Sequence, residues 1–284
     1  MHPVAVSPAG VTPSAQLDER SQQIVDVLVE AFADLMAADA AAFRTKFRKM
    51  AADPFAFYRG SACLFYADMA ATEDRWSDER TSRVWIHGDL HAENFGTYMD
   101  ATGRIVFDVN DFDEAYLGHV SWDLRRFAAS FALLTWRKAF SDEVIGELIE
   151  VYLTAWLDQV EAFTRSDADR DFALVAGNTE GAVRELIRRT AGRTRLALLD
   201  RMTVVENGER RFADSPRNRR LEEAEHDEVR AALDRYQATL PPRPWRREVA
   251  YDVKDLIGTA GFGIGSAGLP AYLDWVRAET RKES

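Results

Sequence analysis

Three polar residues in the first half of the chain have the types and the order that phosphoryl transfer requires. Asp89 and Asn94 follow the short apolar run 84–86, and Asp111 follows a second apolar run, 105–107. Phosphoryl transfer needs a carboxylate beside the acceptor hydroxyl and side chains that hold a divalent metal against the nucleotide phosphates. Carboxylate and amide oxygens are hard ligands that suit Mg²⁺. The sequence therefore predicts a magnesium-dependent phosphotransferase site built on these three side chains.

A glycine-rich run near the C-terminus offers a second element for phosphate binding. Its small residues are Gly261, Gly263, Gly265, Ser266 and Gly268. Such a run can lay backbone N–H groups over phosphates, although glycine runs are also common as flexible bends. We favour phosphate binding because the run follows the β-type segment 249–258.

Arg59 is a further candidate for contact with the nucleotide, because it stands beside Gly60 after the aromatic run 55–58. A guanidinium there can hold a phosphate through two parallel N–H groups. It can equally begin a helix and pair with a nearby carboxylate. The sequence leaves both roles open.

Three motifs, taken in order, resemble those of aminoglycoside-phosphotransferase-like kinases. The catalytic loop of these kinases is similar to HGDLHAEN at 87–94, and their metal-binding loop to VNDFD at 109–113. A structural aspartate that braces their catalytic loop is matched by Asp123 in WDLRR at 122–126. Together with the run 55–60 and the late glycines, these motifs make the chain resemble the bacterial DUF2252 family, over about residues 40 to 272.

The resemblance implies a role for each residue of the motifs. Asp89 would be the catalytic base, with ATP and Mg²⁺ as cofactors. The metal ligands would be Asn94 and Asp111, with Asp113 as a second, weaker ligand. The same comparison assigns His87 and His91 to the catalytic loop, which they would shape by hydrogen bonding.

The resemblance also implies the fold, a protein-kinase-like one in which a mainly helical lobe carries a short β-element with both loops. In ordinary kinases the glycine loop precedes the catalytic loop, whereas here it follows, so the lobe order would be permuted. The family would continue beyond the glycines into a strand with a nucleotide-gripping lysine, but this chain ends in a polar, helix-like segment at 272–284. We therefore expect a C-terminally shortened member with a partial nucleotide lobe.

The elements that must position these residues can be read from apolar periodicity. Residues recurring every three or four positions predict helices at 24–36, 41–52, 120–140 and 142–165, and a mostly helical, charged stretch at 176–240. The short runs 84–86 and 105–107 predict two strands joined through a turn at 100–103. Trp85 and Trp122, which flank the motifs, are expected in the core.

These elements divide into three parts and give an α+β class. We expect residues 1–16 to form a disordered tail and residues 17–240 to form a mainly helical catalytic domain. Residues 241–284, which begin with a proline-rich linker, would form the partial nucleotide lobe.

The amino-acid composition limits the classes of molecule that the chain is expected to bind. The 284 residues carry a net charge of -11, which disfavours nucleic acid, and we predict a nucleotide and a small-molecule or protein acceptor instead. No apolar run reaches the ~18–20 residues of a membrane span and no signal peptide is visible, so we expect a cytoplasmic protein without membrane contact. The single cysteine, Cys63, excludes an intrachain disulfide.

Two other functions stay open. One is a pseudokinase-like module that keeps a nucleotide or metal site without catalysis, which the missing lysine favours. The other is a metal-dependent phosphoesterase, since Gly88–His91 also resembles part of a dinuclear phosphatase signature. Such enzymes need a further Gly-Asn-His element, and the sequence contains none.

Overall fold

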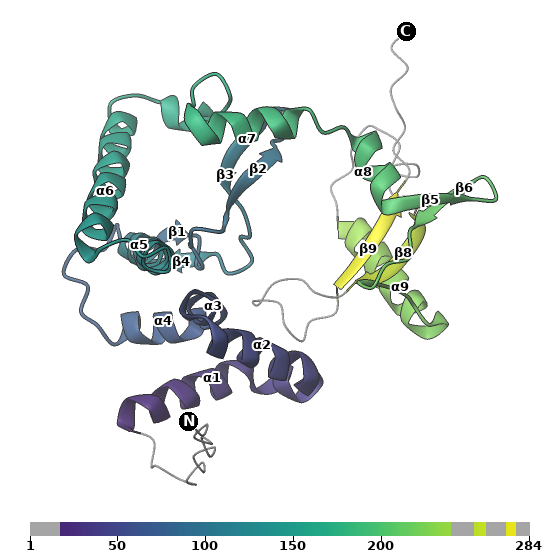
Figure 1. The fold of residues 1–284 in the computed structure, drawn as a ribbon, viewed down its shortest axis with the longest axis horizontal. Helices are drawn as coiled ribbons and strands as arrows, with labels where there is room; N and C mark the ends of the chain where they lie inside the picture. The colour runs from purple at the N-terminus through teal and green to yellow at the C-terminus, as the bar shows by residue number, and fades with distance from the viewer. Residues whose placement is uncertain (1–17, 240–252, 260–270, 277–284) are drawn as a thin grey trace, which may run out of the picture.

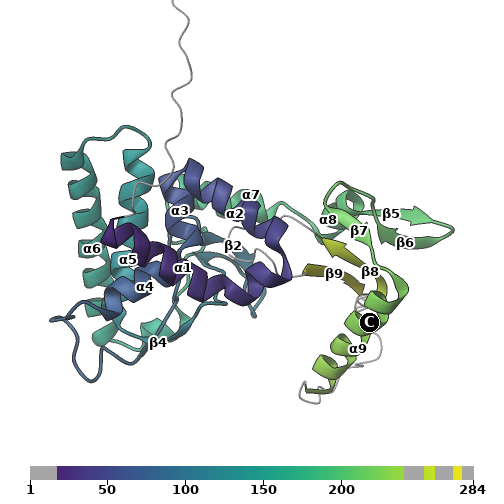
Figure 2. The same ribbon diagram turned by 90° about the horizontal axis from the view of Figure 1, so that it is seen from below.

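A computed structural model describes residues 18–239, 253–259 and 271–276, with nine α-helices and four small antiparallel sheets in these ranges. The predicted α+β class, mostly helical, is confirmed. Both ribbon views show the elements in two groups joined by the segment between α7 and α8 (Figures 1 and 2). The predicted tail and the glycine run lie outside the described residues, as does the linker at 241–244.

Four helices form the N-terminal part, and aspartates cap three of them. The helices are α1 (Glu19–Ala38), α2 (Ala40–Ala52), α3 (Pro54–Gly60) and α4 (Ala62–Ala70). The carboxylates of Asp18, Asp39 and Asp53 accept from the first backbone N–H groups of α1, α2 and α3, which have no partner inside a helix. α2 packs on α3 and α1 on α4, around buried residues that include Phe43 and Phe55.

Two short hairpin-like sheets carry the motif loops. β1 (Val84–Ile86) pairs with β4 (Tyr116–Gly118), and β2 (Phe95–Met99) pairs with β3 (Ile105–Val109). The prediction that the runs 84–86 and 105–107 are joined through one turn is therefore wrong: the turn at 100–103 joins β3 to β2. The catalytic motif consequently lies between β1 and β2, and the metal motif between β3 and β4.

Two long helices follow, as predicted. α5 (Val120–Trp136) contacts α3 and β1, and α6 (Asp142–Thr164) packs along α5. Ser141 caps α6 through the N–H of Val144. α5 begins directly after β4, so its first turns lie beside the motif loops.

The stretch 176–240 is less helical than predicted. The short 3-10 helix η1 (Ala168–Asp171) precedes it. The stretch itself contains α7 (Gly181–Ala191), α8 (Arg195–Met202) and α9 (Glu223–Thr239), and also the strands β5 (Thr203–Glu206), β6 (Glu209–Phe212) and β7 (Asn218–Arg220). The Asn207-Gly208 pair supplies two successive positive φ angles, 52° and 84°, which close a two-residue hairpin between β5 and β6.

The C-terminal sheet has the order β7-β8-β9, with β8 (Val253–Thr259) and β9 (Ala271–Val276) antiparallel. The glycine run therefore connects two paired strands, and Thr259 and Ala271 form the last pair before it. β7 joins this sheet by pairing with β8. Asp255 on β8 fixes the junction, because it pairs with Arg220 and accepts from the N–H of Phe212.

Two further findings concern the surface. Trp85 is 76% exposed, so its predicted place in the core is wrong: its strand, β1, belongs to a sheet of only two strands in the described part of the chain. Among the helices of the described residues, none is long and apolar enough to cross a bilayer.

Candidate active site

The catalytic motif is held from behind by α5. The Asp123 carboxylate accepts from the backbone N–H groups of His87 at 2.6 Å and Gly88 at 3.2 Å. One helical turn later Arg126 reaches Asp89, and one further turn on Ser130 accepts from the N–H of Ala92 at 3.1 Å. A rigid helix thus fixes the motif at three successive points.

Gly88 permits the turn that this attachment requires. Its φ is +84°, and a Cβ at this position would lie 1.9 Å from the Glu114 carbonyl oxygen. Only glycine tolerates both the left-handed backbone and this close approach. The Glu114 backbone, just after the metal motif, therefore packs directly on the catalytic motif.

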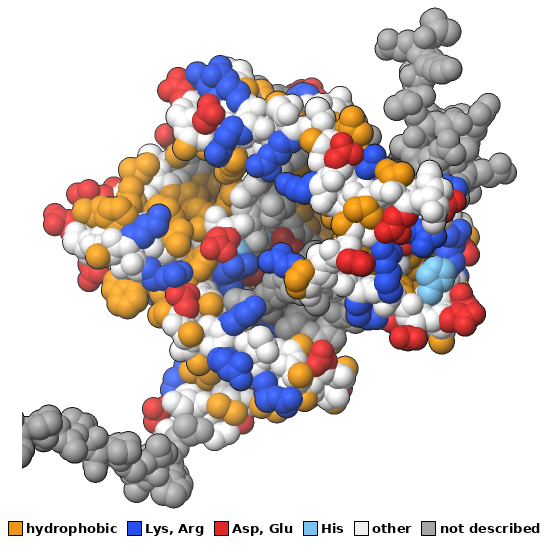
Figure 3. All heavy atoms as spheres, turned by 45° about the vertical axis from the view of Figure 1, so that its right-hand side comes forward, with side chains coloured by type: hydrophobic (Ala, Val, Ile, Leu, Met, Phe, Trp, Pro, Cys, Tyr) orange, Lys and Arg blue, Asp and Glu red, His pale blue; other side chains and the backbone are white. Residues whose placement is uncertain are grey.

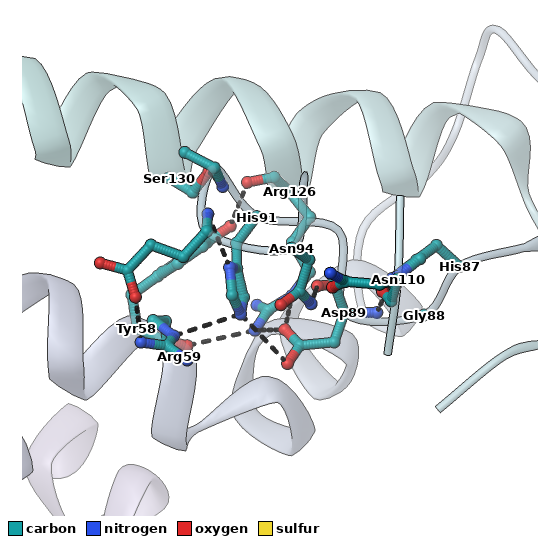
Figure 4. Close-up of polar contacts among 12 residues, drawn as sticks. Tyr58, Arg59, His87, Gly88, Asp89, His91, Asn94, Asn110, Arg126 and Ser130 are labelled. Atoms are coloured by element: carbon teal, nitrogen blue, oxygen red, sulfur yellow. Dashed lines mark hydrogen bonds and ion pairs between the residues drawn. The ribbon is translucent and has the colours of Figure 1, made fainter. Parts of the chain in front are cut away.

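Asp89 makes an ion pair with a fully buried arginine. Arg126 is 0% exposed, and both its Nε (2.8 Å) and its Nη2 donate to Oδ1 of Asp89 (Figure 4). Burial raises the pKa of Asp89, against the opposing effect of the Arg126 charge. The carboxylate is 17% exposed, and no residue of the described ranges hydrogen-bonds its Oδ2.

Asn94 is oriented by the same motif. Its Nδ2 donates to the Asp89 carbonyl oxygen at 2.9 Å. The Oδ1 atom of Asn94 is therefore the side-chain atom that could bind a metal ion. Its backbone carbonyl accepts from Asn110, on the metal motif, at 2.9 Å. The Asn110 carbonyl in turn accepts from His87 Nε2 at 2.7 Å. These two contacts join the catalytic motif to the metal motif.

Both histidines make hydrogen bonds that shape the loop. His87 Nδ1 accepts from the N–H of Asp89, so Nε2 carries the proton that is donated to Asn110. His91 Nδ1 accepts from the N–H of Glu93, and its Nε2 lies 3.2 Å from Arg59 Nε. Burial, reinforced by the charges of Arg59 and Arg126, lowers the pKa of His91 to about 3. His91 is therefore uncharged near pH 7.

Asp111 has an unusual backbone for a non-glycine residue, with φ at 69°. Such a conformation is costly, and its occurrence two residues after the end of β3 marks a position held by its surroundings. Burial and then the neighbouring Asp113 carboxylate raise the pKa of Asp111. Two carboxylates that repel each other in this way would each gain from a bound cation.

The donors fit a magnesium ion better than a closed metal site. In the described ranges no group of three or more His, Cys, Asp or Glu side chains is arranged to hold a metal. Mg²⁺ usually takes one or two carboxylates and completes its shell with substrate phosphates and water. The amide oxygen of Asn94 and the carboxylates of Asp111 and Asp113 are ligands of that kind.

Arg59 lies in the last turn of α3, not at a helix start. Its Nη1 pairs with Glu93, and its Nε points at His91. The pairing with a nearby carboxylate that the sequence allowed is present, and the guanidinium remains partly exposed at the edge of the catalytic motif.

Comparison with protein families identifies the chain. Residues 38–283 match the family model described as "uncharacterized protein conserved in bacteria (DUF2252)". The chain belongs to the DUF2252 family. No curated protein and no solved structure matches it. The family and its bacterial distribution agree with the resemblance seen in the motifs.

The glycine run of this DUF2252 chain stays a prediction as a phosphate-binding element. Gly261, Gly263, Gly265, Ser266 and Gly268 lie outside the described residues, and only their flanking strands β8 and β9 are described. In Figure 3, Lys and Arg side chains are spread over the face from top to bottom, with Asp and Glu side chains among them.

Two residues of the DUF2252 site were missed from the sequence, Arg126 and Ser130. Both are 0% exposed, and with Asp123 they recur at three- and four-residue spacing on one face of α5. A helix face normally buries apolar side chains, so polar residues at this spacing beside the apolar stripe are a signal that could have identified them.

Proposed function

We propose that this chain is a kinase-like phosphotransferase that uses ATP and Mg²⁺ and acts on a hydroxyl acceptor. The observation that carries the proposal is the junction between the two motifs. Asn110 donates to the Asn94 carbonyl and accepts from His87, so the expected base and the expected metal ligands belong to one hydrogen-bonded unit. Phosphoryl transfer depends mainly on such positioning.

Asp89 would act as the base. Its Oδ2 is free of hydrogen bonds within the described ranges and would accept the proton of the acceptor hydroxyl. The pKa of Asp89 is raised by burial, which makes the carboxylate a stronger base than an exposed aspartate. The lowered pKa of His91 makes its ring a weak base that would not compete for this role.

Asn94 and Asp111 would hold the metal, with Asp113 as a weaker ligand. Mg²⁺ in such sites neutralises charge on the nucleotide phosphates. Arg59 and the glycine run between β8 and β9 would contact the phosphates.

One observation favours a second function, a pseudokinase-like module that binds a nucleotide without transferring phosphate. Asp89 is already paired with Arg126, and a carboxylate in an ion pair is a poorer proton acceptor than a free one. Turnover of ATP separates the two functions, because only the phosphotransferase produces ADP.

Thermal unfolding tests whether the site exists. A ligand at about one hundred times its Kd stabilises a protein by about 2.7 kcal/mol, which raises the Tm by several degrees. We expect ATP with Mg²⁺ to raise the Tm of the wild type and EDTA to abolish the shift. Asp111→Asn should lose the shift, whereas Asp158→Asn, an exposed aspartate on α6, should keep it. A wild type that shows no shift at any ATP concentration would remove the proposal.

A further inference from the structure

Arg126 is the residue of the site that the expected chemistry leaves without a role. It lies on α5 at 0% exposure, where charged side chains occur only when they are paired. Its guanidinium carbon lies 4.6 Å from the centroid of the Tyr58 ring and 5.2 Å from that of the Phe65 ring, and the two rings contact each other edge to face. Cation–π contacts with two neighbouring rings leave the arginine little freedom to change its direction.

The polar contacts of Arg126 are directed at a single oxygen. Nε and Nη2 both donate to Oδ1 of Asp89, and Nη2 also donates to the Tyr58 carbonyl at 3.2 Å. The Tyr58 hydroxyl donates back to the Arg126 carbonyl at 3.1 Å, so two hydrogen bonds join Arg126 on α5 to Tyr58 on α3. Oδ2 is left outside this network, and its nearest charged or titratable partner is His91 Nε2 at 3.7 Å.

Arg126 keeps this arrangement although one of its own donors is lost. Its Nη1 is buried and has no hydrogen-bond partner in the described part of the chain. An unsatisfied buried donor is unfavourable, and a guanidinium free to rotate would satisfy it. The orientation is therefore dictated by Asp89 and the two rings.

We propose that Arg126 is the positioning residue of Asp89. By occupying Oδ1 with two donors it fixes the rotation of the carboxylate and presents Oδ2 as the oxygen that meets the acceptor hydroxyl. The inference deepens the proposed function and rests on it for the identity of that acceptor. The pairing itself can be tested without turnover.

The kinetic test compares Arg126→Met and Arg126→Lys with the wild type in production of ADP from ATP and Mg²⁺. Arg126→Met should lower kcat by about a hundredfold, because misplacement of a reacting group by an ångström has this effect. Its KM for ATP should stay within about threefold, because no hydrogen bond or ion pair in the described part of the chain joins Arg126 to Arg59, Asn94 or Asp111. Lysine supplies one point charge in place of a planar fork, so Arg126→Lys should also stay well below the wild type. Full activity in either variant would overturn the proposal. A rise in the KM for ATP as large as the fall in kcat would also overturn it.

A double-mutant cycle distinguishes loss of the Arg126–Asp89 pairing from general destabilisation of the variants. Asp89→Asn leaves a buried, unpaired guanidinium and should lower the Tm by about 10 °C. Adding Arg126→Met removes that charge, so the double variant should unfold at a higher temperature than Asp89→Asn alone. The matched control is the exposed pair Arg165–Glu161, where Arg165→Met and Glu161→Gln should be additive within about 2 °C.

The two experiments separate the two claims. A wild type without turnover, combined with strong coupling in the cycle, would remove the proposed function and keep Arg126 as the residue that fixes Asp89. Additive changes in the cycle would overturn the positioning role whatever the turnover.

Discussion

Asp123 on α5 accepts the backbone N–H of His87 at 2.6 Å, across 36 positions of the sequence. The same carboxylate accepts from Gly88. Asp123→Ala would leave two N–H groups without their charged acceptor, at about 1.5–3 kcal/mol for each such hydrogen bond. We expect a loss of about 3 kcal/mol in the free energy of unfolding, measured by urea denaturation. Asp158→Ala, on the exposed face of α6, should change it by less than about 0.5 kcal/mol.

Gly88 and Gly103 form a natural pair for testing the close approach of the two motifs. Both have positive φ angles, 84° and 87°, but an added Cβ meets the Glu114 carbonyl only at Gly88 and finds open space at Gly103. Gly103→Ala should cost about 1–2 kcal/mol of backbone strain. Gly88→Ala adds a steric clash to the same strain and should cost about 3 kcal/mol or more. Equal losses in urea denaturation would contradict the packing of Glu114 on Gly88.

The lowered pKa of His91 gives a prediction for how the free energy of unfolding depends on pH. Its pKa is lowered to about 3 in the folded chain, below the ordinary histidine value of about 6.5. Below pH 6.5 the unfolded state therefore binds a proton that the folded state does not, and stability falls as the pH falls towards 3. The loss reaches about 2 kcal/mol by pH 5. His91→Gln should reduce the fall in Tm between pH 7.5 and 5, and an unchanged fall in this variant would contradict the account.

Long helices were predictable because their apolar stripe and their ends are both local. The pattern at 120–140 and 142–165 predicted α5 and α6, and Ser141 provides the cap between them. The β5–β6 hairpin also had a local signal, the Asn207-Gly208 pair, which the charged composition around it obscured. The partner of β1 had no such signal. β4 is a three-residue strand about thirty positions away, and only the packing of α5 against β1 brings the two together.

The candidate site also contains contacts that local sequence predicts and contacts that it does not. Asp89 and Asn94 lie five positions apart in one loop, so their contact through the Asp89 carbonyl follows from local sequence. Arg126 follows Arg125 on a helix, and in sequence only its place on the same helix face as Asp123 and Ser130 distinguishes it from an exposed arginine. Its burial depends on Asp89, 37 positions away, and on the rings of Tyr58 and Phe65, which come from other elements. Nothing local in the sequence specifies that arrangement.

Production of ADP from ATP and Mg²⁺ tests the central claim most directly. It should be measured with the chain alone and with added acceptors: hydroxylated metabolites, aminoglycosides and serine-containing peptides. We predict ADP formation that EDTA abolishes and that Asp89→Asn lowers by at least about a hundredfold, assayed below the Tm of that variant, while Asp158→Asn keeps full activity. Failure of the wild type to form ADP with any acceptor, or equal rates for the wild type and Asp89→Asn, would contradict a phosphotransferase built on this loop.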